Sequence, residues 1–123
     1  MKITSITPLI VSQNAEDIIK VMEALGFEKI HRKTDIEGGQ NVNVDMKDAN
    51  GNRVDVASSK NVPKDLLSIK INVDDFDEAY DFFISRGFIN TRGDKVTETS
   101  SSRDTYLISP SGFAITLTQH IKD

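Results

Sequence analysis

The chain has 123 residues, with 15 basic and 19 acidic side chains and a net charge of −4. This acidic balance argues against a nucleic-acid-binding protein, which would carry a basic surface, and no stretch reaches the roughly 20 apolar residues of a membrane span. With no cysteine, disulfides and thiolate chemistry are excluded. The length fits one domain with a sizeable core, and the lack of cysteine and of an apolar signal core favours a cytoplasmic protein.

The first half of the chain is predicted to form a strand, a helix and three more strands. A strand over Thr4–Val11 precedes a helix over Ala15–Leu25, whose apolar residues recur three and four positions apart. Ser12 or Asn14 is expected to cap the start of this helix, and Gly26 to end it in the left-handed conformation. The three strands that follow are predicted over Phe27–Thr34, Asn41–Met46 and Asn52–Ser58.

The second half repeats this order. A strand over Leu67–Val73 leads into a helix over Phe76–Ser85 that Gly87 ends. Asp74 and Asp75 supply a cap and negative charge at the helix start. The last three strands are predicted over Phe88–Arg92, Asp104–Ile108 and Gly112–Gln119.

Two pairs of glycines repeat at one spacing. Gly26 and Gly87, each followed by Phe, lie 61 residues apart (87 minus 26), and Gly51 and Gly112 keep the same distance. Such self-similarity predicts tandem modules. We expect one domain over residues 1–123, with βαβββ modules at about 1–61 and 62–123. A rival fold, two ferredoxin-like units, would need a second helix in each half, and Gln40–Ser58 shows no helical periodicity.

The strand pattern predicts an α+β fold with one polar sheet face. Apolar residues on one side of each strand would pack on the helices, which leaves a polar, helix-free face in each module. We expect the two modules to form a curved, cup-like mixed sheet with the helices on the outer face. The polar positions that would line the cup, and so bind a ligand, are Asn43, Asp45, Arg53, Asp55, Ser68, Lys70, Tyr106 and Thr116.

The charged residues of this set allow two interpretations. Asp55 is the best candidate for a catalytic base, and Arg53 or Lys70 for a partner of an anionic or carbonyl group. The second interpretation, which the sequence supports equally, is that Asp55 forms a structural ion pair with Lys70 or Arg53 in a solvated groove. The neutral members suit hydrogen bonding to a small polar ligand, and suit plain solvent exposure nearly as well.

Three other features carry less chemistry. His31 and His120 are the two histidines, and both are expected in solvent rather than in a catalytic site. The stretch Thr97–Arg103 reads as a loop, and a mobile lid over the cup is the alternative.

The repeat, its helix ends and the turn Ser109–Gly112 resemble the vicinal oxygen chelate superfamily, which contains glyoxalase I, bleomycin-resistance proteins and extradiol dioxygenases. The segment Ile69–Asp75, IKINVDD, looks like the entry strand of that family, and the turn stands where the family often has Asp-Pro-Asp-Gly. The resemblance implies a metal-ligand position at each of Ile6, Asp55, Ser68 and Thr116. Only Asp55 would ligate a divalent ion well, so we expect no metal and no cofactor.

The resemblance implies a small-molecule-binding protein of the glyoxalase/bleomycin-resistance type, which binds or sequesters a polar or aromatic ligand without a metal. The alternatives are a metal-independent isomerase or lyase with Asp55 as base, and a structural or regulatory protein that acts through its dimer surface. A homodimer is expected by analogy, with no nucleic-acid or membrane partner.

Overall fold

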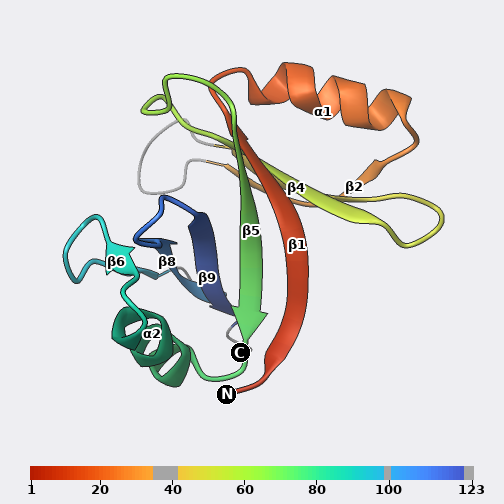
Figure 1. Cartoon of the computed structure of the whole chain (residues 1–123). Coiled ribbons are helices and arrows are strands. Elements are labelled where there is room, and N and C mark those ends of the chain that lie inside the picture. Colours follow the sequence, from red (N-terminus) through yellow and green to blue (C-terminus); the bar gives the residue numbers. More distant parts are fainter. Residues whose placement is uncertain (35–41, 99–100, 121–123) are drawn as a thin grey trace. The chain divides into compact units, whose positions relative to one another are not determined.

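The structure is a computed structural model that describes residues 1–34, 42–98 and 101–120. Contacts divide the chain into two compact units. The N-terminal unit is Thr7–Leu67, and the C-terminal unit combines Met1–Ile6 with Ser68–Asp123. The described elements are β1 (Ile3–Ser12), α1 (Ala15–Ala24), β2 (Glu28–Thr34), β3 (Val42–Lys47), β4 (Arg53–Ser58), β5 (Leu66–Val73), α2 (Phe76–Ser85), β6 (Ile89–Asn90), β7 (Thr97–Glu98), β8 (Ser102–Ile108) and β9 (Ala114–His120) (Figure 1).

The N-terminal unit is a mixed sheet with α1 on one face (Figure 1). Its strands run in the order β2-β3-β4-β1, where β3 is antiparallel to β2 and β4 and the end of β1 is parallel to β4. Helix α1 forms because its apolar residues share one face, and that face buries Ile19. The core is aliphatic and consists of Ala15, Ile19, Val44, Met46, Val54 and Val56.

The C-terminal unit has the same plan. Its sheet runs β5-β9-β8-β6, with β5 and β9 parallel, β8 antiparallel to both β9 and β6, and β7 paired to β8. The start of β1 lies beside β5, where the Thr4 hydroxyl donates to the Asn72 carbonyl at 3.1 Å. The core under α2 contains Val73, Phe76, Ala79, Leu107, Ile115 and Leu117, with Tyr80, Phe83 and Phe88 packed against it. Each unit is therefore helix on sheet, and the expected α+β class is confirmed.

Both helices end in the same way. Gly26 has φ +103° and Gly87 has φ +93°, the left-handed region that glycine enters without a Cβ penalty. In each case the phenylalanine after the glycine donates its backbone N–H to a carbonyl of the last helical turn, with Phe27 bonded to Met22 at 3.0 Å and Phe88 to Phe83 at 3.1 Å. The prediction that Gly26 and Gly87 end the two helices is thus confirmed.

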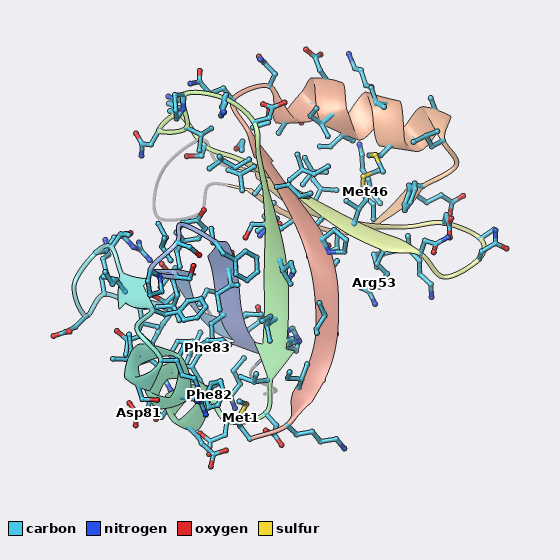
Figure 2. The ribbon with its side chains drawn as sticks, viewed as in Figure 1. Met1, Met46, Arg53, Asp81, Phe82 and Phe83 are labelled. Carbon is cyan, nitrogen blue, oxygen red and sulfur yellow. The ribbon has the colours of Figure 1, made fainter. Side chains whose placement is uncertain are left out.

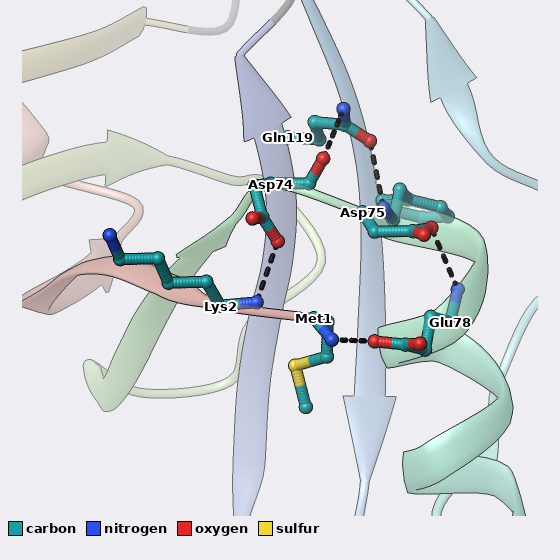
Figure 3. Close-up of polar contacts among 7 residues, drawn as sticks. Met1, Lys2, Asp74, Asp75, Glu78 and Gln119 are labelled. Atoms are coloured by element: carbon teal, nitrogen blue, oxygen red, sulfur yellow. Dashed lines mark hydrogen bonds and ion pairs between the residues drawn. The ribbon is translucent and has the colours of Figure 1, made fainter.

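The start of α2 is tied to the start of β1, as Figure 3 shows. Asp75 caps the helix by accepting the Glu78 N–H at 3.1 Å, and this prediction is confirmed. Asp74 does not cap it, because its carboxylate accepts the Lys2 N–H at 2.6 Å while its N–H donates back to the Lys2 carbonyl. The Met1 amino group pairs with Glu78. These bonds explain why the first residues belong to the C-terminal unit.

The start of α1 lacks an equivalent side-chain cap. Asn14 is the N-cap residue, but its side chain makes no capping bond. The Ser12 hydroxyl instead accepts the Asn14 N–H at 2.9 Å and donates to Asp65 at 2.6 Å. The expected cap from Ser12 or Asn14 is therefore wrong, because Ser12 closes the turn before the helix.

Two expectations for the second half need correction. The stretch Thr97–Arg103 is not simply a loop: Thr97 and Glu98 form β7, and Ser102 and Arg103 begin β8, with Thr97 opposite Asp104. The strand expected over Phe88–Arg92 is shortened to Ile89–Asn90, because Asn90 turns the chain by accepting the Arg92 N–H.

Asn41, at the start of one predicted strand, lies outside the described residues. Among those residues, neither helix has the length and apolarity to cross a membrane.

Candidate functional site

The sheet face of the C-terminal unit that points away from α2 carries four of the eight predicted ligand-binding residues. Ile115 and Leu117 of β9 lie in the core under α2, so the alternate residues of this strand point to the opposite face. We call this side the C-terminal polar face. It consists of Ser68, Lys70 and Asn72 of β5, Ala114, Thr116 and Thr118 of β9, Asp104, Tyr106 and Ile108 of β8, and Ile89 of β6.

One row across this face unites three predicted site residues. Thr116 is the direct strand partner of both Lys70 and Tyr106, which places an ammonium, a hydroxyl and a phenol side by side. Among the described residues, the hydroxyls of Thr116 and Tyr106 have no hydrogen-bond partner. Burial raises the pKa of the Tyr106 phenol above its usual 10. At neutral pH Tyr106 is therefore a hydrogen-bond donor.

The next row holds residues outside the eight predicted ligand-binding positions. Thr118 lies between Asn72 and Asp104, and its hydroxyl donates to the Asp104 carboxylate. Ser102 donates to the other Asp104 oxygen at 3.0 Å. The side-chain oxygen of Asn72 is buried and has no hydrogen-bond partner among the described residues. Strand alternation places Asn72 and Thr118 on the polar side and could have placed Asp104 there, but only the register shows the three in one row.

Ser68 is on the same face but its hydroxyl is already used. It is buried, and its Oγ donates to the Ala114 carbonyl at 2.9 Å. It therefore joins β5 to β9 and keeps only acceptor capacity for a ligand.

A second group lies on the face of the N-terminal unit that points away from α1. Asp45 of β3 and Asp55 of β4 are direct strand partners, and Leu9 of β1 lies on the other side of Asp55. Asp55 is only 2% exposed, and Asp45 is half-buried. Directly opposed side chains have Cβ atoms about 5 Å apart, so two carboxylates face each other across the strands.

The other two predicted residues of this unit flank the carboxylates. Asn43 lies one row away, with its side-chain oxygen buried and without a partner. Arg53 is opposite Lys47 and exposed. In Figure 2, Arg53 points away from α1, whereas Met46 points toward it. The eight predicted residues therefore fall into two groups of four, one on the polar face of each unit.

The four positions at which the resemblance implies metal ligands do not suit a metal ion. Ile6 has no ligating atom, the Ser68 hydroxyl is bonded to backbone, and Thr116 is a neutral hydroxyl, so Asp55 is the single good ligand. No group of three or more His, Cys, Asp or Glu side chains within residues 1–34, 42–98 and 101–120 is arranged to hold a metal ion. His120 is exposed at the end of β9 as expected, and the side chain of His31 lies outside the described set.

A scan against protein-family models finds no match, and a search of curated protein sequences finds none either. Solved structures do match. A methylmalonyl-CoA epimerase is 21% identical, with a TM-score of 0.67 over 94% of each chain. A glyoxalase/bleomycin resistance protein/dioxygenase superfamily member from Vibrio splendidus 12B01 is 14% identical, with a TM-score of 0.59 over 96% of this chain and 99% of that one.

Glyoxalase I from Zea mays gives a TM-score of 0.69 at 13% identity, over 98% of this chain and 44% of the maize chain. Identities this low speak for the fold alone. The chain therefore has the vicinal oxygen chelate fold, as its repeat and helix ends predict.

Proposed function

We propose that this protein binds a small polar or aromatic molecule without a metal, and that the C-terminal polar face makes the principal contacts. The observation that carries the proposal is the row of Lys70, Thr116 and Tyr106 on three adjacent strands. Rigid strands hold these donors in fixed positions, so a ligand would lose little free energy in ordering them.

The chemistry of the row favours a ligand with a carboxylate or carbonyl group. Tyr106 and Thr116 offer hydroxyl donors, and Lys70 adds positive charge. Ile89, Ile108 and Ala114 follow on the other side of Tyr106 and suit an apolar or aromatic portion.

Isothermal titration against a panel of aryl and alkyl carboxylates, ketones and antibiotics tests this proposal. For a ligand so found, Tyr106→Phe and Thr116→Val each remove one hydrogen bond and should weaken binding by about fivefold, or roughly 1 kcal/mol. Tyr80→Phe, on the side of α2, is the matched control and should leave the affinity unchanged. A panel without any binder, or a ligand indifferent to both variants, would overturn the proposal.

A second candidate function is metal-independent proton transfer, as in an isomerase or lyase. The specific observation is the opposed pair of Asp45 and Asp55, with Asp55 almost fully buried. Neighbouring carboxylates in different environments can divide the roles of acid and base. Two structurally similar proteins are named methylmalonyl-CoA epimerases. In this proposal Asp55 removes a proton from the carbon next to a carbonyl group, and Arg53 steadies the charge on the carbonyl oxygen.

Exchange of a substrate C–H for deuterium in D₂O, followed by proton NMR over a panel of carbonyl compounds, tests the second candidate. Asp55→Asn should abolish exchange and keep the far-UV circular dichroism spectrum. Asp48→Asn, in an exposed turn of the same unit, should keep full activity. Full activity of the Asp55 variant would end the idea.

We further propose a cytoplasmic homodimer, by analogy with proteins of this fold. Sedimentation velocity at micromolar concentration checks the assembly, and a monomer throughout that range contradicts it.

A further inference from the structure

A pocket of about 220 Å³ lies on the helix side of the C-terminal unit, and so on the side of the sheet opposite the C-terminal polar face. Its walls come from α2, from the chain between β6 and β7, and from β8. The lining residues are Phe76, Asp77, Tyr80, Asp94, Val96 and Arg103. Nothing in the proposed function uses these residues.

The aromatic wall of this pocket already holds a cation. Phe76 and Tyr80 are stacked, with ring centroids 6.1 Å apart and planes 23° apart. The guanidinium carbon of Arg103 lies 4.7 Å from the centroid of the Phe76 ring. Aromatic faces attract cations through their quadrupole, so the wall has the chemistry of a cation site.

Two carboxylates and one cation are among the described residues that line the pocket. Arg103 pairs with Asp77 at 3.3 Å and with Glu98 at 3.2 Å. Asp94 is the second carboxylate of the lining, after Asp77. An incoming anion would meet an arginine that is already paired and would be repelled by Asp94, whereas a second cation would be attracted. The charge therefore selects for a positive ligand.

Hydrogen bonds from two buried side chains hold the loop that carries Asp94 and Val96. Asn90 donates its side-chain N–H to the Lys95 carbonyl at 2.9 Å and to the Thr105 hydroxyl at 3.0 Å. Thr105 in turn donates to the same carbonyl at 3.1 Å. Asn90 and Thr105 are both buried. These bonds fix the far wall of the pocket before any ligand arrives, which lowers the cost of binding.

We propose that this pocket is a second ligand site, and that it takes a small organic cation, an ammonium or guanidinium group on an apolar or aromatic stem. The stem contacts Val96 and the ring of Tyr80, and the positive group lies between that ring and the Asp94 carboxylate. The pocket is smaller than the roughly 300 Å³ at which drug-sized sites begin, so the ligand is the size of a simple amine.

Titration of ¹⁵N-labelled protein with benzylamine, followed by amide chemical shifts, tests the site. Benzyl alcohol and benzoate are the matched neutral and negative probes. Benzylamine should shift the amides of Phe76, Tyr80 and Val96 in a saturable way, and the other two probes should not. Equal shifts with benzoate or benzyl alcohol, or no saturable shift with benzylamine, would overturn the proposal.

Two variants assign the effect. Asp94→Asn should weaken benzylamine binding by about three- to fivefold, the weight of a partly exposed ion pair. Asp81→Asn removes an equal charge from α2 outside the pocket lining and should change nothing (Figure 2). Equal effects of the two variants would show that benzylamine is held only by general charge attraction, and this would refute the proposed site. Tyr106→Phe should leave benzylamine binding intact. The proposal for this pocket and the proposal for the C-terminal polar face are therefore tested independently.

Discussion

The two units share one backbone plan but differ in their chemistry. Their helix ends and their last hairpin turns repeat the same kinds of backbone hydrogen bond at the spacing of 61 residues (112 minus 51). The Gly51 N–H donates to the Asp48 carbonyl, and the Gly112 N–H donates to the Ser109 carbonyl. Their polar faces diverge: Tyr106 stands where the N-terminal unit has Asp45. The backbone repeat is thus fixed by glycines and turns, and the face left over is free to vary.

Their cores differ as well. The buried residues of the N-terminal core include Met46 and no aromatic side chain, and Phe27 packs against them. The C-terminal core buries Phe76, and three further aromatic side chains pack against it. Only α2 has a side-chain cap at its start. The helix of the C-terminal unit is therefore the better anchored of the two, and this difference can be tested by substitutions at matched positions.

The largest expected effect is truncation of Phe76, which is 2% exposed. Phe76→Ala should lower the free energy of unfolding by about 3–5 kcal/mol, because it removes a large buried ring and leaves a cavity. Its counterpart in the N-terminal unit is Ile19→Ala, at 1% exposure, with an expected loss of about 2–5 kcal/mol. Urea unfolding followed by circular dichroism measures both.

Phe82→Ala is the control for these variants, because Phe82 is 40% exposed on the same helix. It should cost clearly less than Phe76→Ala. A Phe82 variant as destabilised as the Phe76 variant would contradict the assignment of the core under α2.

The next effect concerns the helix starts. Asp75→Ala removes the bond from the Glu78 N–H and should cost about 1 kcal/mol. Asn14→Ala removes no side-chain capping bond and should cost less. Thermal unfolding of the two variants compares them directly, and an equal or larger loss at Asn14 would show that the two helix starts are not different after all.

Most of the fold follows from local signals in the sequence. Gly26 and Gly87 mark the helix ends because the left-handed conformation is costly for other residues, and strand alternation assigns Ile115 and Leu117 to the core. The caps could be predicted only in part. Asp74 and Ser12 both look like caps, but long-range bonds, to Lys2 and Asp65 respectively, take up their side chains. Such bonds have no signature in the local sequence.

The site was less predictable for the same reason. Alternation placed Lys70 and Thr116 on the polar side, and the spacing of 61 residues placed Tyr106 there. Only the register shows that the three share a row. Alternation gave no sign that the Ser68 hydroxyl would be bonded to backbone. The pocket on the helix side of the C-terminal unit could not be predicted either, because it is formed by tertiary contacts. Arg103 reaches Phe76 only when β8 lies under α2.

A smaller effect is the pH dependence of stability that comes from Tyr106 on the C-terminal polar face, one of two tyrosines in the chain. Burial raises the pKa of its phenol above 10, so the unfolded chain loses this proton at a lower pH than the folded protein does. Stability should therefore fall as the pH rises past about 10. Absorbance titration at the tyrosinate band should show a component above pH 10 that disappears in Tyr106→Phe. An unchanged titration curve would contradict the burial of this ring.

The smallest effect lies in the two equivalent hairpin turns. Asp48 accepts the Asn52 side-chain N–H at 2.8 Å and the backbone N–H groups of Asn50 and Asn52. The side-chain bond from Asn52 is the main reason that the pKa of the exposed Asp48 carboxyl lies below 3.8. Because this pKa is lower in the folded state, the stabilisation is complete above the unfolded pKa and is lost as the pH falls through the folded one. The equivalent Ser109 accepts the Phe113 N–H at 2.9 Å with a hydroxyl that does not titrate. Asp48→Ser should therefore flatten the stability profile slightly below pH 4, as measured by urea unfolding across pH, whereas Ser109→Ala should shift it equally at every pH.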